Sequence, residues 1–124
     1  MDRVVHFEIP YDDKGRASKF YSEIFGWKLF DIPEMNYTLI HAAKVDGNNM
    51  VDEKGAINGG LFQRSNDAGQ PIIVIGVQSI DDTIKNVIAA GGRLVTPKQS
   101  IPNGSYARIA DSEGNVIGIA DESK

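Results

Sequence analysis

The chain has 124 residues, of which 41% are hydrophobic and 24% are charged. These values predict one folded domain and exclude a disordered or collagen-like chain. Seventeen acidic and 13 basic residues give a net charge of −4, which argues against a protein built to neutralise nucleic-acid phosphates.

The composition also excludes cysteine-based sites and bears on the cellular location. There is no cysteine, so disulfides, thiolate nucleophiles and cysteine metal sites are excluded. No apolar run approaches the roughly 20 residues of a membrane span, and the first residues, MDRVVHFEIP, lack the pattern of a secretory signal. We therefore expect a cytoplasmic protein with no membrane or nucleic-acid partner.

The first half of the chain predicts a strand, a helix and three further strands. Residues 4–9 alternate with the period of two that a strand requires. Over residues 16–25, apolar residues recur at the spacing of one helical face, and Gly26 follows where a C-cap glycine is expected. Strands are then predicted over 27–32, 37–43 and 56–63. The polar segment 45–55 predicts a mobile loop that could act as a lid.

The second half repeats this pattern. Residues 71–77 predict a strand, and Ser79 predicts the N-cap of a second helix. Further strands are predicted to begin at residue 93 and to cover 106–110 and 115–121. The predicted fold class is α+β, a single domain of two β-α-β-β-β modules at residues 1–65 and 70–124. One such module leaves a sheet face open, so two modules are expected to enclose a shared cavity.

Several motifs resemble those of the vicinal oxygen chelate superfamily, which includes glyoxalase I and the bleomycin resistance proteins. They are VHFEIP, ASKFYSEIFGWKL, INGGLF, AAGGRLVTP and ARIADSEGNVIGIAD, and the resemblance that rests on them extends over nearly the whole chain. The resemblance implies a cupped, eight-stranded mixed sheet with the helices outside and a small-molecule ligand in the cup. It also implies a homodimer, because members of the family commonly form one.

The same resemblance implies where a divalent metal would be chelated. The four ligand positions fall at His6, at or near Asn58, at Ile72 and at Gly118. Ile72 and Gly118 offer no ligating side chain, and one imidazole with one amide does not hold zinc or nickel in a stable site. We therefore expect no metal and no other cofactor, and we do not expect the metal-dependent glyoxalase I reaction.

The first strand carries the candidate catalytic residues. In the family its metal-position face looks into the cup, so alternation directs His6 and Glu8 into the cavity. The intervening residues Val5, Phe7 and Ile9 are then expected to face the helix. His6 and Glu8 are the candidate acid/base groups, although a core role for His6 is an equal alternative.

An apolar cup makes a buried carboxylate costly unless it is paired. A structural ion pair is therefore favoured for Glu8, with Arg108, Arg64 and Arg93 as the candidate partners. A ligand-facing general base is the other interpretation.

Other side chains are candidates for binding a ligand. The same parity, together with the aromatic positions, selects Asn58, Phe62, Tyr106, Arg108, Trp27 and Tyr37. For Trp27, packing is favoured over ligand stacking, and for the two tyrosines both interpretations stay open. His41 is expected to face solvent. The Asp12–Asp13 and Asp81–Asp82 pairs indicate helix N-termini rather than carboxylate dyads.

These observations predict a glyoxalase- or bleomycin-resistance-like protein that binds a small, partly apolar molecule. It would be a lyase or isomerase of unassigned reaction. A drug- or metabolite-sequestering protein without catalysis is the alternative, and a regulatory or interaction module is a third possibility.

Overall fold

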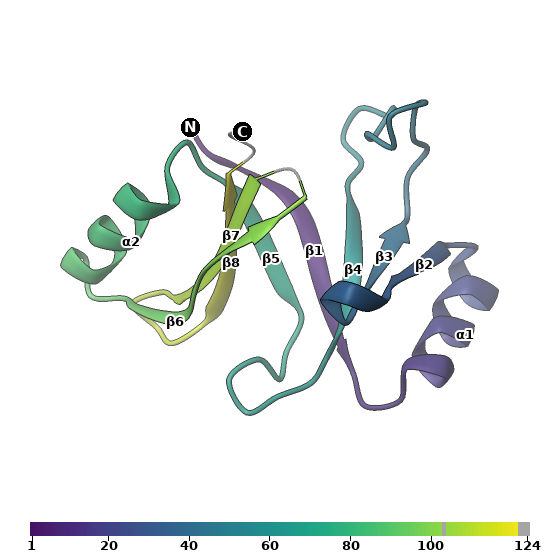
Figure 1. Ribbon diagram of the computed structural model, residues 1–124, viewed down its shortest axis with the longest axis horizontal. Helices are drawn as coiled ribbons and strands as arrows, with labels where there is room; N and C mark the ends of the chain where they lie inside the picture. The colour runs from purple at the N-terminus through teal and green to yellow at the C-terminus, as the bar shows by residue number, and fades with distance from the viewer. Residues whose placement is uncertain (103, 122–124) are drawn as a thin grey trace. The chain divides into compact units, whose positions relative to one another are not determined.

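The computed structural model describes residues 1–102 and 104–121, and the chain folds as two compact units (Figure 1). The N-terminal unit is His6–Pro71, and the C-terminal unit combines Met1–Val5 with the residues from Ile72 onward. Strand β1 (Arg3–Tyr11) therefore contributes to both units. This division differs from the predicted modules, which assigned all of β1 to the first.

The N-terminal unit follows the predicted order of elements. After β1 come α1 (Lys14–Phe25), β2 (Lys28–Ile32), a 3₁₀ turn η1 (Pro33–Met35), β3 (Tyr37–His41) and β4 (Asn58–Gln63). β4 pairs in parallel with β1 and antiparallel with β3, which pairs antiparallel with β2.

The C-terminal unit repeats this arrangement. Its elements are β5 (Ile72–Gly76), α2 (Ile80–Ala89), β6 (Arg93–Ile101), β7 (Gly104–Ala110) and β8 (Val116–Asp121). β8 pairs in parallel with β5 and antiparallel with β7, which pairs antiparallel with β6. The strand order is β2-β3-β4-β1-β5-β8-β7-β6, so the predicted α+β fold with an eight-stranded mixed sheet is confirmed.

Local sequence signals set the helix ends. The Asp13 side chain accepts a hydrogen bond from the Arg16 N–H at 2.9 Å, and Ser79 accepts one from the Asp82 N–H at 3.1 Å. Gly26 ends α1 with φ 73°, a left-handed conformation that glycine adopts without strain. The predicted caps are therefore confirmed, and Asp13 serves a helix N-terminus as expected.

Each unit has its core on the strand face that its own helix covers. In the N-terminal unit the buried residues are Tyr11, Ile40 and Leu61, and the partly buried residues around them include Phe7, Ile9, Ala17, Tyr21 and Trp27. In the C-terminal unit the buried residues are Ile80, Ala107, Ile109 and Ile119. The two-residue period of the strands thus separates a helix-covered face from an opposite face in each unit.

The β1 alternation is confirmed for Phe7 and Ile9 but not for Val5. A Cβ atom on Gly76 would lie 3.1 Å from a Val5 methyl group, so Val5 packs in the C-terminal unit and not against α1. The reason is that β1 passes from one unit to the other between Val5 and His6.

Two segments are more regular than predicted. In the segment 45–55, Val45 and Val51 form an antiparallel bridge, so the predicted loop is a small hairpin. β6 continues past Pro97 to Ile101, with register shifts on either side of Thr96. Proline is tolerated there because β6 is an edge strand with an irregular ladder. None of the helices in the described residues is long and apolar enough to cross a membrane.

Candidate functional site

The first candidate site lies on the N-terminal unit, on the strand face opposite α1. The register pairs Glu8 of β1 with Gly60 of β4, and Gly60 with Leu39 of β3. Residues paired in this way share a face, and alternation adds His6 and Tyr37 to it. We call the face that carries His6, Glu8, Tyr37 and Leu39 the His6 face.

A hydrogen bond joins two of the predicted residues on this face. His6 Nε2 lies 2.9 Å from the Tyr37 hydroxyl oxygen. A Cβ atom on Gly60 would lie only 2.0 Å from that same hydroxyl oxygen. The absence of a side chain at Gly60 is therefore what lets Tyr37 cross the face and reach His6.

Burial controls the protonation of His6. Desolvation lowers the pKa of His6 from its ordinary value of 6.5, and the nearby Glu8 carboxylate acts in the opposite direction. Because desolvation is the larger effect, His6 is a neutral imidazole at neutral pH. Glu8 is itself buried, with 3% of its surface exposed. The face thus brings a neutral imidazole, a phenol and a carboxylate together.

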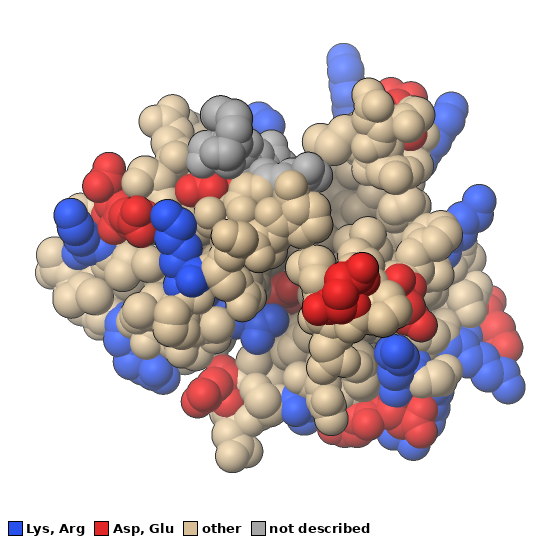
Figure 2. Space-filling model, in the orientation of Figure 1, with Lys and Arg blue, Asp and Glu red and all other residues tan. Residues whose placement is uncertain are grey.

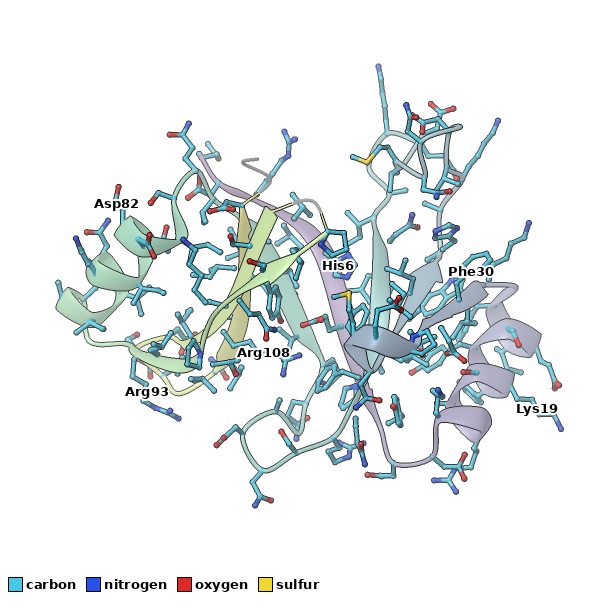
Figure 3. All side chains as sticks on the ribbon, in the orientation of Figure 1. His6, Lys19, Phe30, Asp82, Arg93 and Arg108 are labelled. Carbon is cyan, nitrogen blue, oxygen red and sulfur yellow. The ribbon has the colours of Figure 1, made fainter. Side chains whose placement is uncertain are left out.

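The His6 face extends across β2 and β3 to residues that were not among the predicted site residues. The register places Phe30 of β2 beside Leu39, and the Phe30 and His41 rings lie 4.8 Å apart. Phe30, which is labelled in Figure 3, is 47% exposed, whereas His41 is partly buried and not simply solvent-facing as expected. The sequence signal that could have predicted these residues was the alternation along β3 of Tyr37, Leu39 and His41.

The Asn58 side chain, at the start of β4, stabilises the local backbone through hydrogen bonds. Its side-chain oxygen accepts hydrogen bonds from the Ala42 and Ala43 N–H groups at 2.9 and 2.8 Å. These two bonds hold the chain just after β3, and they engage the amide oxygen that a metal or ligand would need.

The other two predicted ligand-binding residues of the N-terminal unit lie on opposite faces of the strands. Trp27 packs on the α1 side, with its ring 5.1 Å from that of Tyr21 and 5.5 Å from that of Phe7. It is therefore a packing residue, which was the favoured interpretation. Phe62 follows Gly60 by two residues on β4 and pairs with Pro10, so it shares the His6 face, where it is buried.

A second group of predicted residues lies on the C-terminal unit, on the face opposite α2. The register pairs Arg108 of β7 and Val74 of β5 with Gly118 of β8. The Arg108 Nε–H donates a hydrogen bond to the Tyr106 hydroxyl at 2.8 Å. A Cβ atom on Gly118 would lie 2.9 Å from that hydroxyl, so Tyr106 fills the space of a side chain at position 118. We call this face the Arg108 face.

Among the candidate partners of Glu8, Arg64 is bound elsewhere. Its Nε lies 3.1 Å from an Asp12 carboxylate oxygen, and its guanidinium also donates to the Gly69 carbonyl. Arg64, one of the three candidates, therefore bonds to Asp12 and Gly69 rather than to Glu8. Arg93 is exposed at the start of β6 (Figure 3).

The residues at the implied metal positions do not fit a divalent metal site. His6 Nε2 is hydrogen-bonded to Tyr37, the Asn58 oxygen is engaged by two backbone N–H groups, and Ile72 and Gly118 carry no donor atom. Within residues 1–102 and 104–121, no group of three or more His, Cys, Asp or Glu side chains is arranged to hold a metal ion.

The C-terminal unit also contains a cavity of about 260 Å³ away from the Arg108 and Tyr106 side chains. It is lined by Met1, Asp2, Arg3, Val5, Gly76, Val77, Gln78 and Ala120. None of the predicted site residues lines this cavity. It is therefore separate from the polar groups of the His6 face and of the Arg108 face.

Comparison with known proteins gives a family match and a curated relative. A family model described as bleomycin resistance protein-like N-terminal matches residues 3–42. A lactoylglutathione lyase from Haemophilus influenzae is 28% identical over 120 residues, which cover 93% of this chain and 89% of that protein.

Solved structures share the fold over nearly their whole length. A variant of methylmalonyl-CoA epimerase from Streptomyces coelicolor, in complex with 2-nitronate-propionyl-CoA, has a TM-score of 0.68 at 15% identity, covering 98% of each chain. A hypothetical protein from Bacillus halodurans has a TM-score of 0.65 at 18% identity, covering 99% of this chain and 96% of its own. At these sequence identities the structures show only that the fold is shared. The family match, the relative and the shared fold agree with the resemblance of the motifs to the vicinal oxygen chelate superfamily.

Proposed function

We propose that this protein binds a small, partly apolar molecule on the His6 face and moves a proton on it, as a lyase or isomerase. The observation that carries the proposal is the 2.9 Å hydrogen bond between His6 and Tyr37, on the face that also holds the buried Glu8. Acid/base catalysis needs groups of this kind within hydrogen-bond reach of each other and of a ligand.

The surroundings of these polar groups suit a partly apolar ligand. Phe30 and Leu39 supply apolar surface on the same face, and Phe30 is accessible to solvent. Small-molecule sites typically combine apolar walls with a few placed polar groups. The Tyr37 side chain occupies the space over Gly60 and so brings its hydroxyl to His6 on this face.

The protonation of His6 suits proton transfer. With its pKa lowered by burial, His6 is neutral at neutral pH and has one ring nitrogen able to accept a proton. When the Tyr37 hydroxyl donates to Nε2, the phenol and the imidazole form one acid/base pair. Glu8, next along β1 on the same face, is the candidate general base.

The match to the bleomycin-resistance-like family model favours a second candidate function. It covers residues 3–42 and thereby β1, α1, β2 and β3, which include His6, Glu8 and Tyr37. In this alternative, the protein sequesters a drug or metabolite on the same face without converting it.

The first experiment is native mass spectrometry of the full chain, purified without chelator and without a polyhistidine tag, to detect a bound organic molecule. Binding is then measured by calorimetry with S-lactoylglutathione, methylmalonyl-CoA and bleomycin, the compounds that the relatives' names supply. Proton movement is measured as deuterium uptake by each probe from D₂O.

Two conservative variants separate the candidate functions. Tyr37→Phe and Glu8→Gln keep the shape of the face, so for an enzyme we expect binding to persist while deuterium uptake falls about 100-fold or more. The matched control is Tyr21→Phe, which removes a hydroxyl on the α1 side and should change neither quantity. Loss of affinity without any uptake would favour sequestration. Absence of an adduct and of binding to all three probes would contradict both functions.

A further inference from the structure

Three side chains that donate hydrogen bonds form one row across the His6 face of the N-terminal unit. His6 of β1 pairs with Asn58 of β4, and His41 of β3 pairs with Lys28 of β2. Continued by one residue, the antiparallel register of β3 and β4 brings His41 opposite Asn58. Residues paired across strands share a face, so Asn58, His41 and Lys28 lie side by side. We call these three residues the donor row.

The amide of Asn58 has a fixed orientation. Its side-chain oxygen accepts hydrogen bonds from the backbone N–H groups of Ala42 and Ala43. Only an oxygen accepts two such bonds, so the NH₂ group occupies the other position of the amide. That NH₂ group has no acceptor within residues 1–102 and 104–121. In the same residues, the only buried side-chain polar atom without a partner is Asp121 Oδ1, so the Asn58 nitrogen is accessible from outside.

The other two members of the donor row also have no polar partner in the described part of the chain. Neither the His41 ring nitrogens nor Lys28 Nζ makes a hydrogen bond or an ion pair there. The contact of the His41 ring with Phe30, which is labelled in Figure 3, confirms that His41 lies on this face. Lys28 is exposed on β2, at the edge of the sheet. The row therefore presents an amide, an imidazole and an ammonium group that the protein itself does not use.

The charge around the donor row is not neutralised on this face. The strand positions of the His6 face carry one carboxylate, Glu8, which lies on β1 at the opposite end of the order β1-β4-β3-β2 from Lys28. Figure 2 shows basic and acidic side chains interspersed over the visible surface, and the net charge of the chain is −4. No broad basic patch therefore attracts anions, and the donor row must act by direct contact.

We propose that the ligand of the His6 face carries an anionic group, a carboxylate or a phosphate, that binds to the donor row. Hydrogen bonds to an ionised acceptor are about twice as strong as those between neutral groups. Neighbouring strands lie about 4.8 Å apart, so His41 is about 10 Å from His6 at the level of the backbone. The inference rests on the proposed function, because it uses the same face, and it adds the substrate class: small, partly apolar acids.

The apolar residues of the face fit such a ligand. Phe30 and Leu39 pair with each other in the row next to the donors. With its anionic group on His41 and Lys28, a ligand would lay its apolar part over these two side chains. Its reacting end would then point along the face toward His6.

The test is a titration of the ¹⁵N-labelled full chain, followed by heteronuclear NMR. The probes are phenylacetate, phenyl phosphate and the neutral phenylacetamide. We expect both anions to shift the side-chain NH₂ resonances of Asn58 and to bind at least about 10-fold more tightly than the amide. Tighter binding of phenyl phosphate would identify phosphate esters as the ligand class, and tighter binding of phenylacetate would identify carboxylic acids.

Two variants and a matched control assign this affinity to the donor row. Lys28→Gln should weaken binding of the anions about 10-fold and leave phenylacetamide unchanged. Asn58→Asp keeps the oxygen that Ala42 and Ala43 need but replaces the NH₂ group with a second carboxylate oxygen, so it should weaken anion binding about 100-fold or more in a folded chain. Lys85→Gln removes an exposed lysine of α2 and should change no affinity.

The outcomes separate this inference from the proposed function. A chain that binds neither anion, or that binds the acids and the amide equally, would overturn the inference. So would an anion affinity that neither Lys28→Gln nor Asn58→Asp lowers. The titrations need no turnover, so anion binding without deuterium uptake from D₂O would contradict catalysis and support the anion site. Deuterium uptake by a neutral probe in a chain that binds no anion would support catalysis and overturn the anion site.

Discussion

At the scale of single residues, the burial of His6 should make the stability of the fold depend on pH. Its pKa is lowered in the folded chain by desolvation, whereas in the unfolded chain it has the ordinary value of 6.5. The unfolded chain therefore takes up the proton first as the pH falls. The stabilising contribution of neutral His6 is complete above 6.5 and is lost as the pH falls from 6.5 through the folded-state pKa.

The measurement is urea unfolding of the wild type and His6→Gln at a series of pH values. His6→Gln keeps a polar group for Tyr37 but removes the titration, so its stability should fall less than that of the wild type below 6.5. Asp111→Asn serves as the comparison. Hydrogen bonds from Asn115 lower the pKa of Asp111 from its ordinary value of 3.8, so this substitution should change the pH dependence of stability only below pH 3.8. Parallel curves for the wild type and His6→Gln would contradict the prediction.

The sequence predicted which face His6 and Glu8 occupy, but not what His6 touches. Alternation along β1 is a local property with a period of two residues, so it could be read directly. The Tyr37 contact depends on the register of β3 against β4 and of β4 against β1. That register is set by pairing across a hairpin and a helix, which one stretch of sequence does not reveal.

At the scale of elements, Asn58 joins the end of β3 to the start of β4. Asn58→Ala would leave the Ala42 and Ala43 N–H groups without their acceptor, and it should lower the free energy of unfolding by about 2 kcal/mol. Asn58→Asp keeps an oxygen in the same place and should cost less than about 1 kcal/mol.

Chemical denaturation of both variants checks this prediction. The control is Asn48→Ala, an exposed asparagine of the hairpin 45–55, which should stay within about 0.5 kcal/mol of the wild type. Equal losses for the alanine and aspartate variants at position 58 would show that the side-chain oxygen is not the stabilising feature.

The elements were predictable where their signals are local. Asp13, Gly26 and Ser79 mark helix ends through hydrogen bonds or backbone angles within a few residues. β6 was underestimated because Pro97 usually ends a strand, and only the position of β6 at the sheet edge makes it tolerable. The contact between the Phe30 and His41 rings was not predicted because it joins side chains of two different strands.

At the scale of the whole molecule, β1 makes the two units depend on each other. Its residues up to Val5 belong to the C-terminal unit, and those from His6 onward pair with β4 in the N-terminal unit. Because the two halves are consecutive in one strand, loss of order in one half should loosen the pairing of the other. We therefore expect the chain to unfold in one cooperative transition.

A core substitution that leaves a cavity in the C-terminal unit tests this coupling. Ile119 is 3% exposed in the core beside α2, and Ile119→Ala should cost about 3 kcal/mol. Trp27 reports on the N-terminal unit by fluorescence, because it is the single tryptophan and packs beside α1. If the units unfold together, the Trp27 transition shifts to lower denaturant by the full amount, whereas Ile88→Ala, at an exposed position of α2, leaves it in place. A Trp27 midpoint unchanged by Ile119→Ala, with hydrogen exchange at Ala107 accelerated, would show that the units unfold separately and that β1 can be released from one while it stays paired in the other.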